Sequence, residues 1–195
     1  MIYSSKPSNE EILQCVQLVR AGDKCAFENL FKHFYAQLCE FAFQYVKNRQ
    51  CAEDIVQLLF LHIYEKGEEW NPTGNIKSYL FTAVRNRSLN YLRSQSKTND
   101  HQSLDNPSSD ALKLSHTHVE EELYAQDLNR AIQSAFENMP DQRRRIFMLS
   151  RESNLTYREI AKVLGISIKT VETQMGRALK LLRKELNIFF TLIKN

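Results

Sequence analysis

The sequence predicts an all-α protein of two small helical domains joined by a flexible linker, the C-terminal domain being a helix-turn-helix. Three observations lead to this prediction. Only five glycines and four prolines occur in 195 residues, so few positions interrupt helices. Apolar residues recur at steps of three and four along most of the chain, which is the helical period. Residues 95–118 instead form a run rich in Ser, Asn, Asp and His, which is typical of a mobile connection.

The predicted first domain, residues 1–94, opens with two helices that have recognisable start signals. Ser8 and Glu11 have the spacing of a capping box, and Asp23 can cap the following helix. From Phe27 onward, aromatic and aliphatic residues repeat at helical spacing. We interpret this second helix as part of the packed core.

Residues 51–66 form a predicted helix that is apolar on nearly every side. Such a helix either lies at the centre of a domain or presents an apolar face to a partner. Asp54 and Gln57 are three residues apart on one side and could flank that face with hydrogen bonds. From the residues alone, both interpretations stay open.

The next predicted helix, residues 75–93, carries basic and aromatic residues opposite an apolar stripe. Residues 71–99 contain five Lys/Arg and no Asp or Glu. This combination suits single-stranded or distorted nucleic acid, because cations neutralise phosphates and rings stack on bases. A basic surface helix with its aromatics in the core would be equally favoured if no second DNA module followed.

The predicted C-terminal domain, residues 119–195, resumes the helical pattern. We expect Asp141 to cap a helix over 142–150 whose three arginines, beginning at Arg143, point outward. Residues 143–195 carry twelve Lys/Arg against four Asp/Glu. Two basic stretches separated by acidic ones suggest two contacts with a polyanion, although a single solvated basic face would explain the charge alone.

Residues 156–183 predict a helix-turn-helix. Thr156 and Glu159 form a second capping-box pattern. Gly165 supplies the left-handed residue that ends the short first helix, and Ser167 can cap the second helix. The second helix has a polar face able to reach base edges and phosphates. Its opposite, apolar stripe comprises Ile168, Val171, Met175, Ala178, Leu179 and Leu182. An ordinary helical hairpin explains this stripe but not the spacing of Ala161, Gly165 and Val171 joined to a polar outer face, so DNA binding is the favoured interpretation.

The remaining composition argues against a metal centre, an enzyme or an exported protein. The cysteines lack any C-x-x-C spacing, so we expect buried free thiols in a reducing compartment. His116 and His118 could ligate a metal, but no further ligands cluster with them, so neither metal nor cofactor is predicted. The acidic residues fall mostly on helix surfaces and caps, which disfavours an enzyme. No leader and no apolar run of about twenty residues is present, so we expect a cytoplasmic protein without membrane insertion.

Four segments together resemble the bacterial sigma-70 superfamily, specifically the extracytoplasmic-function (ECF) sigma factors. They are AEDIVQLLFLHIY (52–64), NIKSYLFTAVRNRSLNYLR (75–93), NMPDQRRRIFMLS (138–150) and LTYREIAKVLGISIKTVETQMGRALKLLR (155–183). The helix-turn-helix alone is weakly specific, whereas the combination is strong. The resemblance implies a sigma factor with its region 2 domain in residues 1–94 and its region 4 domain in residues 119–195.

The resemblance also implies three binding surfaces. One helix docks on the β′ clamp helices of core RNA polymerase, through Asp54, Gln57, Phe60 and Leu61. A second captures unstacked bases of the −10 promoter element, through Asn75, Lys77, Tyr79, Arg85, Asn86, Asn90 and Arg93. The third reads the −35 element in the major groove, through Arg158, Lys169, Thr170, Glu172, Thr173, Gly176 and Arg177. The polymerase β flap and an anti-sigma factor are further implied partners.

Two positions depart from the usual family pattern, because Asn90 replaces an acidic residue and Tyr79 replaces Trp. The alternative function is a polymerase-independent helix-turn-helix regulator that uses residues 1–94 for sensing or dimerisation. An enzyme such as a transposase would need clustered carboxylates or a nucleophile in a polar pocket, and the sequence offers neither pattern.

Overall fold

The computed structural model describes residues 8–98, 132, 134–136 and 138–193, and these parts contain helices and turns but no strand. The predicted all-α class is confirmed. The elements, in chain order, are α1 (Asn9–Arg20), α2 (Lys24–Val46), α3 (Arg49–Lys66), the 3-10 turn η1 (Gly67–Glu69), α4 (Ile76–Thr98), α6 (Asp141–Arg151), α7 (Tyr157–Leu164) and α8 (Ile168–Ile193).

The helices begin where the sequence supplies side-chain caps. Ser8 and Glu11 complete the predicted capping box of α1. Asp23 Oδ1 accepts a hydrogen bond from the Ala26 N–H at 2.9 Å and so caps α2. Asn48 caps α3 in the same way, by accepting from the Cys51 N–H. These caps satisfy backbone donors that the first turn of a helix leaves unpaired.

Helices α1, α3 and α4 all pack against α2. The fully buried side chains at the centre include Leu38 and Phe41 of α2, Leu59 of α3 and Phe81 of α4. The rings of Phe41 and Phe81 meet edge to face, with their centroids 5.1 Å apart. Since α2 supplies residues to three neighbours, it is the central helix of this first unit.

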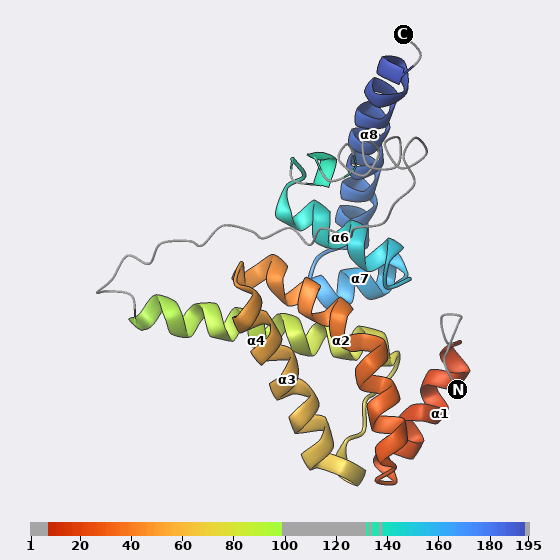
Figure 1. Ribbon diagram of the computed structural model, residues 1–195, viewed down its shortest axis with the longest axis vertical. Helices are drawn as coiled ribbons and strands as arrows, with labels where there is room; N and C mark the ends of the chain where they lie inside the picture. Colours follow the sequence, from red (N-terminus) through yellow and green to blue (C-terminus); the bar gives the residue numbers. More distant parts are fainter. Residues whose placement is uncertain (1–7, 99–131, 133, 137, 194–195) are drawn as a thin grey trace, which may run out of the picture.

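Helices α6, α7 and α8 form the second unit, in which α8 packs against both α6 and α7. Gly165 ends α7 with φ of 64°, the left-handed conformation that the sequence predicts. Ser167 Oγ then accepts from the Thr170 N–H at 3.0 Å at the start of α8. The predicted helix-turn-helix is therefore present as α7–turn–α8. Figure 1 shows α8 running away from the first four helices.

The two units lie against each other. Helix α7 packs on α4, and α6 meets α2 (Figure 1). The buried apolar cluster is continuous, because it includes Leu80 of α4 together with Ile160 and Val163 of α7. This contact brings the loop before α4 next to the helix-turn-helix.

Two local predictions about helices were wrong. Helix α4 continues to Thr98, past the predicted end at residue 93, so the first four residues of the predicted linker are helical. Pro140 occupies the N-cap position of α6 and gives no side-chain cap, while Asp141 is the first helical residue. The Asp141 carboxylate instead pairs with Lys47 Nζ of α2 at 2.8 Å. The rest of the predicted linker, including His116 and His118, lies outside the described residues.

Candidate functional site

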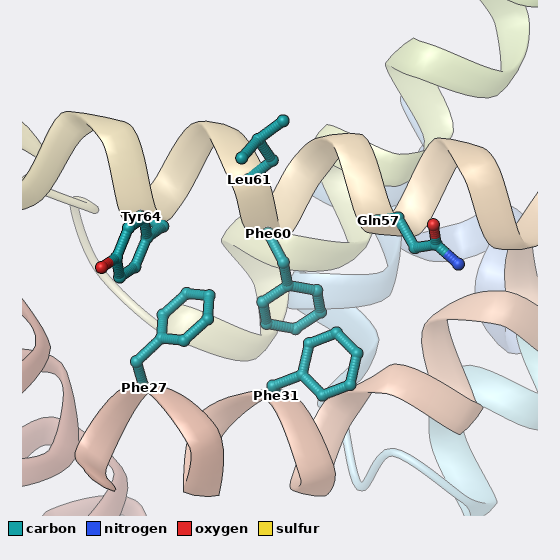
Figure 2. A pocket seen from close by; sticks show the side chains of 6 residues that line it. All are labelled: Phe27, Phe31, Gln57, Phe60, Leu61 and Tyr64. Atoms are coloured by element: carbon teal, nitrogen blue, oxygen red, sulfur yellow. The ribbon is translucent and has the colours of Figure 1, made fainter. Parts of the chain in front are cut away.

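An open groove of about 360 Å³ lies between α2 and α3. Its lining is aromatic and aliphatic apart from one amide, and comprises Phe27, Phe31, Gln57, Phe60, Leu61 and Tyr64 (Figure 2). The Phe27 and Tyr64 rings lie 5.2 Å apart, and the Phe31 and Phe60 rings 4.9 Å apart. Interlocked rings hold the groove in one shape, because edge-to-face pairs favour a defined geometry.

The outer side of α3 exposes apolar side chains that a packed core would hide. Leu58, Leu61 and Tyr64 are 55%, 50% and 54% exposed. Asp54 and Gln57 are also exposed, and Gln57 Nε2 donates to the Tyr35 hydroxyl at 3.3 Å. Phe60 is among the residues predicted to contact core polymerase. In the structure it is only 2% exposed and forms the floor of the groove.

Several members of this apolar surface were not among the predicted contact residues. Phe27 and Phe31 follow the same helical spacing as the core of α2, so sequence periodicity alone assigned them to packing. Leu58 and Tyr64 were detectable only through the excess of apolar residues around α3. The number of apolar residues on this helix indicated that an apolar face could be exposed. It did not identify the residues that form that face.

The residues assigned to the −10 element lie on α4 and the turn before it. Asn86, Asn90 and Arg93 are exposed. Lys77, Tyr79 and Arg85 are half-buried, and Tyr79 packs edge to face against Trp70 at 6.2 Å between ring centroids. Trp70 is 3% exposed, so the loop before α4 is anchored in the core.

Asn75 uses both ends of its amide. Its Oδ1 accepts from the Lys77 N–H at 2.9 Å, which caps the start of α4. Its Nδ2 donates to Glu159 Oε1 of α7 at 2.6 Å. Glu159 also takes part in the capping box of α7 with Thr156. This side chain therefore connects the first turn of α4 to the first turn of α7.

The polar face of α8 is open to solvent. Arg158 of α7 and the α8 residues Lys169, Glu172, Thr173, Gly176 and Arg177 are exposed, and Thr170 is half-buried. Lys169 Nζ lies 3.5 Å from Glu172 Oε2, and the Thr173 hydroxyl donates to the Lys169 carbonyl at 2.9 Å. A Cβ on Gly176 would meet no heavy atom within 4 Å. No described side chain therefore blocks the polar face of α8 at Gly176, and a partner could contact the helix closely there.

Two predictions about exposure in the second unit were wrong. Ile168 belongs to the predicted apolar stripe, yet it is 42% exposed at the first position of α8. The arginines of α6 do not simply point outward. Arg143 Nε donates to Gln174 Oε1 of α8 at 3.1 Å, whereas Arg145 turns toward α2.

The cysteines are free but not fully buried, since Cys25 is exposed and the other three are half-buried. Desolvation raises the pKa of the Cys39 thiol to about 11, and burial also raises the pKa of Cys15. A thiol with a raised pKa is a poor nucleophile at neutral pH. Within the described residues, no three His, Cys, Asp or Glu side chains cluster as a metal site would require. Nor is any described helix long and apolar enough to cross a membrane.

Comparison with known proteins matches both helical units. The family "Sigma-70 region 2" matches residues 30–98, and "Sigma-70, region 4" matches residues 129–182. RNA polymerase sigma factor SigV of Bacillus subtilis is 30% identical over 145 residues, which cover 74% of this chain and 81% of SigV. The ECF RNA polymerase sigma-E factor of Haemophilus influenzae is 23% identical over 177 residues, covering 88% of this chain and 93% of that protein.

Solved structures share the fold. CnrH in complex with the cytosolic domain of CnrY aligns with a TM-score of 0.55 and 19% identity, over 90% of this chain and 96% of that one. Sigma factor RpoE from Bartonella quintana, in complex with the anti-sigma factor NepR, aligns with a TM-score of 0.54 and 20% identity, over 92% and 96%. The chain belongs to the sigma-70 family and is an RNA polymerase sigma factor of the ECF type, which directs transcription initiation.

Proposed function

We propose that this sigma factor divides promoter recognition among three surfaces. The groove between α2 and α3, with Asp54 and Gln57 beside it, binds the β′ clamp helices of core polymerase. Helix α4 and its preceding turn take the melted −10 strand. The polar face of α8 reads the −35 element as duplex. The observation that carries this proposal is the exposed apolar surface of α3, because a protein that worked without a partner would be expected to cover it.

The α3 surface suits a helical partner. Leu58, Leu61 and Tyr64 project from one helix beside a groove lined by aromatic rings. Apolar anchors seated in a groove are how helices recognise one another in complexes. Asp54 and Gln57 add polar groups at the edge of this surface, where they can fix the register of the partner helix.

The two DNA surfaces differ in the chemistry that they offer. The exposed Asn86, Asn90 and Arg93 of α4 can bond base edges and phosphates of a single strand. On α8, Glu172 can accept from a cytosine amino group, and Arg177 can donate to guanine in the major groove. We assign residues 1–94 to the region 2 domain, 95–118 to a linker and 119–195 to the region 4 domain, on the support of the two family matches.

We further propose that an anti-sigma factor and the polymerase β flap bind this chain. RpoE of Bartonella quintana was solved with the anti-sigma factor NepR, and its fold matches this one. A sigma factor acts where polymerase and chromosome are, so we place the protein in the cytoplasm, without membrane insertion. It serves there as an initiation factor and not as a catalyst.

Core binding is the decisive test. Leu58→Ala with Leu61→Ala should weaken binding of purified core polymerase about tenfold or more, because truncating an interface anchor commonly costs more than 1 kcal/mol. Leu13→Ala is the matched control, since Leu13 is a leucine of α1 with 53% exposure that does not line the groove. Asp54→Ala with Gln57→Ala should weaken binding while leaving the helical content unchanged.

Fluorescence anisotropy with labelled sigma factor measures these affinities, and run-off transcription from a genomic promoter pool measures function. Wild-type affinity in the Leu58/Leu61 variant would remove the basis of the proposal. Specific binding of a promoter duplex by a wild-type chain that does not bind core polymerase would favour a polymerase-independent helix-turn-helix regulator.

A further inference from the structure

We propose that Tyr35 of α2 is a positioning residue for core-polymerase binding. Its hydroxyl holds the nitrogen of the Gln57 amide toward α2, so that the amide oxygen is presented to the partner as a hydrogen-bond acceptor. This inference rests on the proposed binding of core polymerase by the exposed surface of α3. It adds one residue of α2 to that surface, and it requires the partner to place a hydrogen-bond donor opposite Gln57.

The contact between α2 and α3 changes from aromatic to polar along the groove. Phe31 of α2 meets Phe60 of α3 with ring centroids 4.9 Å apart. One helical turn further along α2, Gln57 Nε2 donates to the Tyr35 hydroxyl at 3.3 Å. The hydrogen bond between Tyr35 and Gln57 therefore lies at the polar end of a groove whose other walls are rings and aliphatic side chains.

The Tyr35 side chain is held in place by its neighbours on α2. Its ring stacks on the ring of Phe31, with centroids 4.6 Å apart and planes 26° apart. Desolvation raises the pKa of the Cys39 thiol to about 11, and a hydrogen bond from the Tyr35 hydroxyl opposes this rise. A hydroxyl fixed in this way can order the longer Gln57 side chain before a partner arrives, which lowers the entropy that binding must otherwise remove.

The two ends of the Gln57 amide differ in what they contact. A glutamine amide has a donating nitrogen and an accepting oxygen. The nitrogen is bonded to Tyr35, whereas no described residue donates to Oε1. Figure 2 shows the nitrogen on the side of α2 and the oxygen turned away from it. Because Gln57 is exposed, a partner helix that approaches α3 meets the oxygen, which a guanidinium, an ammonium or an amide N–H can bond.

A double-mutant cycle in the full-length protein tests whether Tyr35 acts through Gln57. Tyr35→Phe keeps the ring and its stacking but removes the hydroxyl, so core-polymerase affinity should fall about fivefold. Gln57→Met keeps a similar volume without the amide, and it should weaken binding at least as much. In the Gln57→Met background, Tyr35→Phe should have no further effect, because the group that the hydroxyl positions is already gone. Fluorescence anisotropy with labelled sigma factor measures the four affinities.

Tyr91→Phe is the matched control, because the chain contains a second tyrosine in a similar environment. The Tyr91 hydroxyl of α4 accepts from Gln95 Nε2 at 3.2 Å and lies 3.0 Å from the Cys51 thiol. Tyr91 is half-buried like Tyr35, but it does not line the groove. Both substitutions should lower the thermal stability by similar amounts, whereas only Tyr35→Phe should weaken binding of core polymerase.

A third substitution tests the assigned acceptor. Gln57→Glu replaces the amide by a carboxylate, which accepts hydrogen bonds at both oxygens and donates none. One oxygen can accept from the Tyr35 hydroxyl while the other is left for the partner. Gln57→Glu should therefore bind core polymerase at least as tightly as the wild type does, although Gln57→Met, at the same position, should not.

Wild-type affinity in Tyr35→Phe would overturn the positioning role, as would an equal loss in Tyr91→Phe or additive effects of the Tyr35 and Gln57 substitutions. Binding by Gln57→Glu as weak as that by Gln57→Met would overturn the assigned acceptor. The Leu58/Leu61 variant separates these results from the proposed function. If that variant loses affinity while Tyr35→Phe does not, only the inference about Tyr35 fails, whereas wild-type affinity in the leucine variant refutes the proposed core-binding surface.

Discussion

Helices α4 and α8 are both basic helices that the sequence assigns to DNA, yet their surroundings differ. The polar face of α8 contacts little else, and Arg177 is exposed. The N-terminal half of α4 lies against α7, where Asn75 and Arg85 already have protein neighbours. Helices of similar composition thus differ in access: the polar face of α8 is open to a ligand, whereas the first turns of α4 already contact α7.

The difference fits the ligand that we propose for each helix. A duplex presents its groove without distortion, so a fixed, exposed helix can read it. A melted strand exists only after base pairs open, and a free basic helix with rings would bind any single strand that it met.

The largest expected effect compares one arginine from each helix in the free protein. Arg177→Ala should weaken binding of a duplex, selected with wild-type holoenzyme, by about 1–3 kcal/mol, because it removes a base contact from an open face. Arg85→Ala should change single-strand binding by the free protein much less, since Arg85 is turned toward Gly165.

Fluorescence anisotropy measures both affinities for the free protein. With core polymerase added, Arg85→Ala should then reduce promoter opening, which permanganate footprinting detects. If Arg85→Ala impaired the free protein as strongly as Arg177→Ala does, the two helices would be equally accessible.

A pair of glycines tests the turn that presents α8. Gly165 has φ of 64°, so Gly165→Ala should destabilise the protein by about 1–2 kcal/mol in thermal unfolding. Gly176→Ala should instead stabilise it by about 1 kcal/mol, because Gly176 lies inside α8 with open space around it. A Gly165→Ala variant as stable as the wild type would show that the backbone conformation of Gly165 does not require glycine.

Two capping boxes allow the α4–α7 contact to be tested against a matched site. Thr156→Ala should cost about 1 kcal/mol of stability and release Glu159, which also holds Asn75. Ser8→Ala removes an equivalent cap from α1, at a similar cost but far from α7. Only Thr156→Ala should increase binding of a single strand, measured by fluorescence anisotropy. Equal single-strand binding by the two variants would show that the Asn75–Glu159 hydrogen bond does not limit access to α4.

The smallest effect concerns the pH dependence of the ion pair between Lys47 and Asp141. Hydrogen bonding to Lys47 lowers the pKa of Asp141. A lowered native pKa stabilises the fold above the unfolded pKa of about 4, and this stabilisation disappears as pH falls through the native value. Because both partners are nearly half exposed, we expect about 0.2–1 kcal/mol. Asp141→Asn should therefore flatten the stability curve slightly below pH 5 in urea unfolding. An unchanged curve would show that this pair contributes nothing.

Much of the local structure was predictable from the sequence, because it depends on neighbours within one or two helical turns. The capping boxes at Ser8 and Thr156, the left-handed Gly165 and the cap at Ser167 are all present. The exposed polar face of α8 follows from the same periodicity. The prediction for Asp141 failed for a tertiary reason, since its carboxylate pairs with Lys47, 94 residues earlier in the chain.

The sequence by itself determined the helical class, the helix-turn-helix and the excess of apolar residues on α3, because composition and periodicity carry these properties. Only the tertiary structure decided that Phe60 lies beneath the groove while Leu58 and Leu61 stand exposed. It alone placed Asn75 against Glu159. Such contacts depend on how whole helices pack, and packing between distant segments leaves no periodic signal in the residues that it brings together.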